Sequence, residues 1–129
     1  MAKVLVVEDN PANLTLATFL LESAGHSVLT ARDGETGVAL AAAEQPDLIL
    51  MDIQLPGMDG LRATALLKGA AATHDIPVIA LTALAMKGDE ARIREAGCDG
   101  YIAKPLSYKD FLATISTQLE KRAAVQPGS

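Results

Sequence analysis

The chain is poor in the features that mark several other classes of protein. It has 129 residues and a single cysteine, Cys98, which excludes an intramolecular disulfide and agrees with a reducing compartment. No run of about 18 apolar residues is present to span a membrane. The N-terminus carries no apolar signal segment of the right length. We therefore expect a soluble cytoplasmic protein of one domain.

A surplus of basic residues is also missing. The chain has 11 basic and 16 acidic residues, which give a net charge of -5, and most of its basic residues are scattered. It has no tryptophan, two tyrosines and two phenylalanines, too few to build a base-stacking platform. A nucleic-acid binder would need a basic stripe. We therefore expect no direct DNA binding.

Short apolar runs alternate with helix-length segments along the whole chain. Such runs are typical of strands that are buried on both faces of a parallel sheet. The predicted strands are residues 3–7, 28–31, 48–51, 78–81 and 100–103. Their alternation with helices predicts one α/β domain, a right-handed, doubly wound sheet of five parallel strands with five helices. We assign residues 1–122 to this domain and expect the tail, 123–129, to be disordered.

The helices are predicted from their start and stop signals and from their apolar spacing. Asn10 is a plausible cap and Pro11 the first residue of the first helix, which ends at Gly25. Later helices are predicted around residues 37–43 and over 61–68, 87–96 and 108–122. The apolar stripe of the first helix is predicted to contain Leu14, Ala17, Leu21 and Ala24.

Four charged residues directly follow the apolar runs. Glu8 and Asp9 follow the first run, Asp52 the third, and Lys104 the fifth. The carboxyl ends of parallel strands share one edge and ligands bind outside it, so we expect the four charges to converge. Carboxylate oxygens suit magnesium, which also binds phosphoryl oxygens. The cluster therefore predicts a magnesium site beside something anionic.

Each of these residues also has a simpler interpretation. Acids are common at exposed strand ends, and Lys104 alone is either a phosphate-binding charge or a solvated loop lysine. Thr82 either donates to a phosphate oxygen or caps the helix that follows, while the small Ala83 leaves room for a bound group. Considered together, the residues favour a phosphoryl-binding site.

Five separated motifs occur in order along the chain. They are Glu8-Asp9, Ile49-Leu50-Met51-Asp52, Leu55-Pro56-Gly57-Met58-Asp59-Gly60, Leu81-Thr82-Ala83 and Tyr101-Ile102-Ala103-Lys104-Pro105. Together they resemble the receiver domains of two-component response regulators. The resemblance covers about residues 3–122 and implies a flavodoxin-like (β/α)5 fold with strand order 2-1-3-4-5. The segment 85–90, with Gly97 and Cys98, is similar to DivK-type stand-alone receivers and to the receivers of hybrid kinases.

The resemblance implies a role for each residue that binds the phosphoryl group. Asp52 would be the phosphoacceptor, a carboxylate nucleophile that forms an aspartyl phosphate. Thr82 and Lys104 would contact the phosphoryl oxygens, and Tyr101 would be the switch aromatic.

The resemblance also implies the ligands of a magnesium ion. Asp9 and Asp52 would bind Mg2+ directly, and Glu8 mostly through water. The backbone carbonyl of Gln54 would complete the protein ligands. Pro105 is the last position of the matching motifs.

The implied function is that of a single-domain response regulator. It would accept a phosphoryl group from a histidine kinase or histidine phosphotransfer protein and contact a downstream protein target. It would not be an enzyme, apart from self-phosphorylation by small donors and slow self-dephosphorylation. A receiver cut from a hybrid histidine kinase stays an alternative.

Two other classes fit the residues less well. A small metal-dependent phosphohydrolase would need a general acid near the nucleophile, and Gln54 stands two residues after Asp52 instead. A flavodoxin-like cofactor binder would need a phosphate loop after the first strand, where residues 8–11 are acidic.

A phosphodonor histidine must approach Asp52 in line, so its protein has to dock over the rim of the sheet. Leu14 either adds an apolar anchor there or faces the core. The residues predicted nearest that rim are Asn10, Pro11, Asn13, Pro56 and Pro105.

Overall fold

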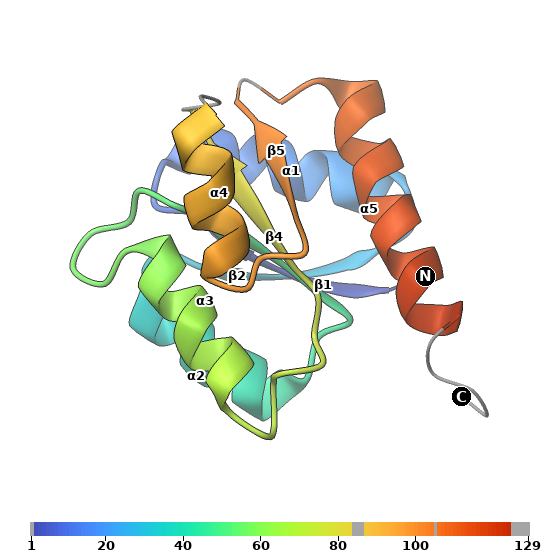
Figure 1. Cartoon of the computed structure of the whole chain (residues 1–129). Coiled ribbons are helices and arrows are strands. Elements are labelled where there is room, and N and C mark those ends of the chain that lie inside the picture. Colours follow the sequence, from blue (N-terminus) through green and yellow to red (C-terminus); the bar gives the residue numbers. More distant parts are fainter. Residues whose placement is uncertain (1, 84–86, 105, 125–129) are drawn as a thin grey trace.

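Strands and helices alternate strictly in the computed structural model, which describes residues 2–83, 87–104 and 106–124 (Figure 1). The five strands pair in parallel in the order β2-β1-β3-β4-β5, which confirms the predicted fold class and order. The strands are β1 (Lys3–Val7), β2 (Ser27–Ala31), β3 (Leu48–Asp52), β4 (Val78–Thr82) and β5 (Gly100–Ala103). The helices are α1 (Pro11–Ser23), α2 (Gly34–Glu44), α3 (Gly60–Gly69), α4 (Lys87–Glu95) and α5 (Tyr108–Ala124).

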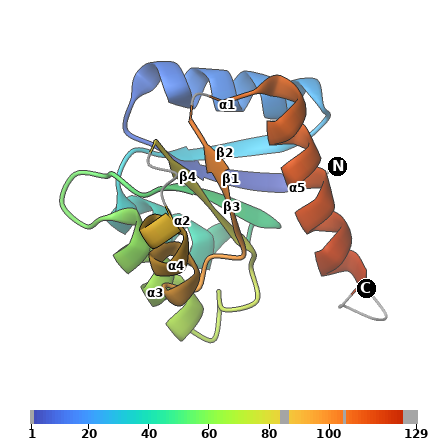
Figure 2. The ribbon, with the colours of Figure 1, turned by 45° about the horizontal axis from the view of Figure 1, so that its top comes forward.

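The sheet is the middle of three layers (Figures 1 and 2). Helices α1 and α5 cover one face, and α2, α3 and α4 cover the other. Strands β3 and β4 are buried along their whole length, and β1 is buried except at Lys3. This explains why the central strands appear in the sequence as continuous apolar runs. The edge strand β2 exposes Ser27 and Thr30 instead.

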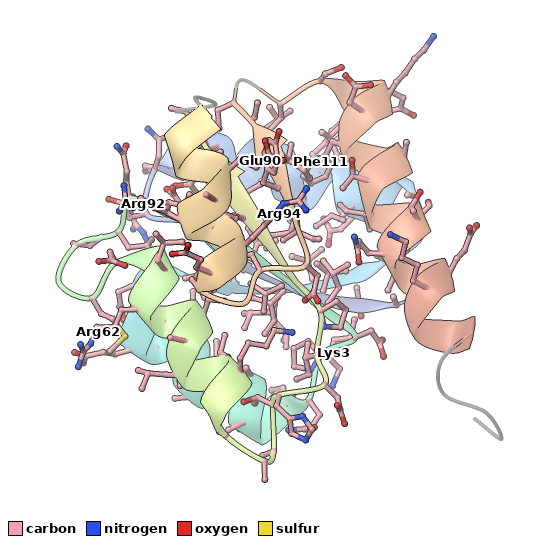
Figure 3. The ribbon with its side chains drawn as sticks, in the orientation of Figure 1. Lys3, Arg62, Glu90, Arg92, Arg94 and Phe111 are labelled. Atoms are coloured by element: carbon pink, nitrogen blue, oxygen red, sulfur yellow. The ribbon has the colours of Figure 1, made fainter. Side chains whose placement is uncertain are left out.

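The core on the α1/α5 face shows how helical spacing fills this layer. Phe111 lies between α5 and the sheet and is fully buried (Figure 3). Ile115 is fully buried one turn later, and Leu119 packs against the same cluster. Spacings of four residues place all three on one side of the helix. These residues form the apolar face of α5 that packs against the sheet.

The first helix begins as its sequence predicts. The side-chain oxygen of Asn10 accepts a hydrogen bond from the backbone N–H of Asn13 at 3.1 Å, and Pro11 is the first helical residue. Of the predicted apolar stripe, Ala17 and Leu21 are buried and Leu14 packs against the core, which confirms these three.

The prediction is wrong for one member of that stripe. Ala24 is exposed because the helix has already ended at Ser23 and Ala24 is its C-cap. Leu20, one position before Leu21, is buried in its place. Gly25 follows with φ of 92°, a left-handed conformation that glycine adopts without strain.

Several element ends lie beyond their predicted positions. The second helix begins at Gly34, three residues before the first residue expected in it, because Asp33 accepts from the N–H of Thr36 at 2.8 Å as a cap. The last helix continues to Ala124 instead of ending at residue 122. The rest of the predicted tail, 125–129, lies outside the described residues. No helix in the described ranges is long and apolar enough to cross a membrane.

Candidate phosphoryl and metal site

The carboxyl ends of all five strands carry polar side chains along one edge of the sheet. The strand order β2-β1-β3-β4-β5 gives the order of these side chains along the edge. Across the sheet they are Arg32 after β2, Glu8 and Asp9 after β1, Asp52 at the end of β3, Thr82 at the end of β4, and Lys104 after β5.

Lys104 holds two of the carboxylates. Its Nζ lies 2.8 Å from Glu8 Oε1 and 3.1 Å from Asp52 Oδ2, and all three side chains are largely buried. Ligand atoms of Glu8, Asp9 and Asp52 lie within 4.8 Å of one another. The expected convergence of the four charges, which are spread over 97 residues from 8 to 104, is therefore present in the fold.

The pKa values of the two buried carboxyl groups shift in opposite directions. Burial, and then the hydrogen bond with Glu8, raises the pKa of Asp52 to about 7. Burial opposes ionisation of Glu8 as well, but hydrogen bonds with Asp52 and Lys104 outweigh it and hold the pKa of Glu8 below its usual value. Burial likewise lowers the pKa of Lys104, and its contacts with both carboxylates raise it by more. Lys104 therefore carries a positive charge at neutral pH.

Backbone contacts fix the two loops that carry the acids. The N–H of Asn10 donates to Glu8 Oε2 at 3.3 Å, and the N–H of Gln54 donates to Asp52 Oδ1 at 3.0 Å. Gly60 packs so tightly that a Cβ there would collide with the carbonyl oxygen of Asp52. Its N–H donates to the carbonyl of Ile53 at 2.9 Å. The start of α3 therefore clamps the turn that follows Asp52.

The donor set fits a hard divalent cation. Three carboxylates supply oxygen ligands, which is the chemistry that magnesium prefers. Among the described residues, Glu8 Oε1 is a buried oxygen without a well-directed hydrogen bond, although Lys104 Nζ is close. A buried acceptor in this condition is costly unless another partner can approach it. The predicted ligand role of the Gln54 carbonyl stays a prediction.

The predicted phosphate and switch residues lie along the neighbouring strands. Thr82 is buried, and its carbonyl accepts from the N–H of Lys104 at 2.8 Å. Ala83 directly follows and is exposed. Tyr101 is 36 % exposed on β5, opposite Ala80 of β4. These positions agree with the roles that the resemblance implies, which stay predictions. Pro105 lies outside the described residues.

Two features of this edge were missed by the sequence analysis. Arg32 donates from Nη2 to the backbone carbonyl of Asp9 at 3.3 Å. Its position immediately after a strand, like that of Lys104, was the available signal. Leu16 and Phe19 on α1 are 39 % and 64 % exposed. Three-residue spacing along a helix without charges before Glu22 was the signal for that surface.

A five-stranded parallel sheet in this order, with acids at its carboxyl edge, defines a flavodoxin-like α/β domain of the signalling type. The chain belongs to the response regulator receiver domain family, which it matches over residues 4–116. Phosphoryl acceptance on an aspartate is the function of this family, and receivers bind magnesium at an acidic pocket.

Known relatives agree with this assignment. The chain is 49 % identical to the polar-differentiation response regulator DivK of Brucella anthropi over 116 residues, 90 % of this chain and 94 % of the relative. The receiver domain of the Pseudomonas aeruginosa sensor histidine kinase PA1611, with a magnesium ion in its active-site cleft, superposes with a TM-score of 0.86 at 35 % identity. That match covers 92 % of this chain and 98 % of the other. The chemotaxis protein CheY4 of Vibrio cholerae has a TM-score of 0.86 at 27 % identity, over 91 % and 98 %.

Proposed function

We propose that Asp52 is the residue of this receiver that accepts the phosphoryl group, and that it takes it from a phosphohistidine of a partner protein. The observation that carries the proposal is the convergence of Asp52 with Glu8 and Lys104 at one edge of the sheet. The class of protein is established by its family. The assignment of each role to a particular residue is the proposal.

The geometry supports a direct displacement at phosphorus. A bond forms between a carboxylate oxygen of Asp52 and phosphorus, and the bond from phosphorus to the imidazole nitrogen breaks with its electron pair on that nitrogen. The imidazole leaves as a neutral group because the other ring nitrogen of the phosphohistidine carries a proton. The carboxylate must be ionised, and with a pKa of about 7 the metal-free site holds it only partly so at neutral pH. Lys104 would contact an oxygen of the transferred group, and the 3.1 Å separation of its Nζ from Asp52 Oδ2 supports this role. The Thr82 hydroxyl is proposed to contact another.

Asp9 and Asp52 would hold a magnesium ion directly, Glu8 would hold it through water, and the Gln54 carbonyl would complete the set. The bound ion would neutralise charge on the phosphoryl oxygens and on the acids. The grouping of three carboxylates against one ammonium supports this assignment, because a single positive charge on Lys104 cannot offset three ionised acids.

The output is proposed to be a change in protein–protein contact. Thr82 would move toward the phosphoryl group and leave space that Tyr101 fills, so the surface of α4, β5 and α5 would change shape. The partial exposure of Tyr101 supports this role, because the ring has an outward position from which to move. A downstream protein would recognise the new surface, and small donors would phosphorylate the domain slowly. A cytoplasmic location is part of the proposal, supported by the single buried thiol of Cys98.

The donor is proposed to dock on the outer face of α1. Leu14 packs against the core, so it is not the anchor. Leu16 and Phe19 are large exposed apolar side chains of α1, and they line a shallow surface with Pro11, Ala12 and Thr15. This surface continues from the Asn10 cap, next to the acid cluster. An uncharged apolar face suits the helices of a histidine kinase or histidine phosphotransfer protein.

Labelling with acetyl phosphate and magnesium tests the proposal. Intact-mass analysis should show one added phosphoryl group on the wild-type protein and none on Asp52→Asn. Asp110→Asn, which changes an exposed acid at the start of α5, is the matched control and should be labelled normally. Normal labelling of Asp52→Asn would refute the assignment.

A further inference from the structure

Arg32 contacts the loop that carries Asp9. It follows the edge strand β2, and its Nη2 donates to the Asp9 backbone carbonyl at 3.3 Å. That carbonyl lies before the helix, because the first hydrogen bond of α1 runs from the N–H of Leu14 to the carbonyl of Asn10. It therefore has no acceptor role in the helix, and Arg32 satisfies it from a neighbouring strand.

A second contact joins the same two segments. The N–H of Glu8 donates to the carbonyl of Ala31 at 3.0 Å, which extends the pairing of β1 with β2 by one residue. Consecutive residues of the β1–α1 loop, Glu8 and Asp9, are thus attached to consecutive residues at the end of β2, Ala31 and Arg32. The backbone of Asp9 cannot rotate freely while both contacts are made.

We propose that Arg32 is a positioning residue for the metal site, which holds the Asp9 peptide so that the carboxylate of Asp9 faces Asp52. This inference rests on the proposed magnesium role of Asp9. Residues that orient metal ligands typically contribute a factor of about 10–100 in metal affinity. Arg32 is exposed and contacts the Asp9 peptide through a single hydrogen bond, so its contribution should be smaller.

The charge of Arg32 and its hydrogen bond to Asp9 have opposite effects on magnesium affinity. A guanidinium near the acid cluster repels a divalent cation, so its removal would tighten magnesium binding if charge alone mattered. Loss of the hydrogen bond frees the Asp9 peptide and weakens binding instead. The sign of the change in magnesium affinity therefore distinguishes positioning from electrostatics.

The test compares Arg32→Met with Arg62→Met. Arg62 lies in the first turn of α3 and projects into solvent, so its variant removes the same charge without a contact to Asp9 (Figure 3). The magnesium dissociation constant is measured from the metal-dependent rise in melting temperature. We expect Arg32→Met to raise it about threefold to tenfold, and Arg62→Met to leave it unchanged or slightly lower.

Labelling by acetyl phosphate provides the second measurement. In Arg32→Met the magnesium concentration for half-maximal labelling should rise by the same factor, while the maximal rate stays normal because Asp52 and Lys104 are untouched. Arg32→Lys keeps a cationic donor and should bind magnesium within about twofold of wild type.

Three outcomes would overturn the inference. They are an unchanged or lower dissociation constant in Arg32→Met, a lysine variant as weak as the methionine variant, and a loss of maximal labelling rate at saturating magnesium. A wild-type protein that shows no magnesium dependence would instead refute the metal role in the proposed function, so the two failures can be told apart.

Discussion

Replacing Asp52 by asparagine should stabilise the metal-free protein at alkaline pH. Asp52 is 3 % exposed, and burial together with Glu8 raises its pKa from 3.8 to about 7. The unfolded chain therefore loses this proton near its ordinary pKa, whereas the folded protein keeps it until about pH 7. The stability that this group contributes is full below pH 3.8, falls as the pH rises, and is lost above about 7.

The size of the effect follows from the same values. A tenfold difference in proton affinity corresponds to about 1.4 kcal/mol, so the cost of ionising Asp52 above pH 7 is at most about 4 kcal/mol. The lowered pKa of Glu8 offsets part of it, and loss of the hydrogen bond to Glu8 costs the variant about 1 kcal/mol. We expect Asp52→Asn to raise the free energy of unfolding by about 2 kcal/mol near pH 8 and by less than about 1 kcal/mol near pH 5.

Urea unfolding in the presence of a chelator measures this difference at both pH values. Asp110→Asn should stay within about 0.5 kcal/mol of wild type, as exposed substitutions usually do. Millimolar magnesium should reduce or reverse the stability gain of Asp52→Asn over wild type, because the ion binds the wild-type site more tightly than the variant site. The raised pKa of Asp52 would be refuted by a variant that is less stable than wild type near pH 8 without metal, or by one that gains the same stability at both pH values.

Three further outcomes are expected. Millimolar magnesium should raise the wild-type melting temperature, and Asp9→Ala should abolish most of that rise; an equal rise in the variant would place the metal elsewhere. Thr82→Ala should still be phosphorylated yet bind its downstream partner poorly, as pull-down of the phosphorylated protein would measure, and unchanged affinity would contradict the proposed switch. Phe19→Ala should slow phosphotransfer from the cognate histidine protein several-fold and leave acetyl phosphate labelling intact, whereas Leu66→Ala on α3, another exposed apolar residue, should change neither. Equal slowing of both reactions in the Phe19 variant would mean damage to the pocket instead of loss of docking.

The central strands were predictable from the sequence because almost all of their residues are apolar. β3 and β4 have no exposed position, so each appears as an unbroken apolar run that ends at a polar residue of the site, Asp52 or Thr82. Parallel pairing then brings those polar residues to one edge without further information. The convergence of Glu8, Asp52 and Lys104 follows from topology alone.

The direction of individual helical side chains was less predictable. Leu14 and Leu16 have the same chemistry and lie two positions apart, which places them on different sides of α1. Leu14 packs against the sheet, while Leu16 is 39 % exposed. Spacing defines a stripe, but the polar residues Thr15, Thr18 and Glu22 form only a narrow strip on α1, and apolar residues lie on both sides of that strip. Only the packed structure decides it.

The protonation of the site was beyond sequence analysis for a different reason. The opposite pKa shifts of Asp52 and Glu8 depend on the burial of both carboxyl groups and on contacts of 2.8 and 3.1 Å to Lys104. Changes of an ångström would alter that balance, and no residue pattern encodes distances so finely. The proposed positioning role of Arg32 was equally unpredictable, since it depends on one hydrogen bond to a backbone carbonyl. Lys104 was predicted as a site residue because acidic residues follow other predicted strands and supply it with partners of opposite charge. An arginine that donates to a backbone carbonyl has no such partner in the sequence. Residues that act through the backbone are therefore the ones that a structure adds to a site already predicted from its charges.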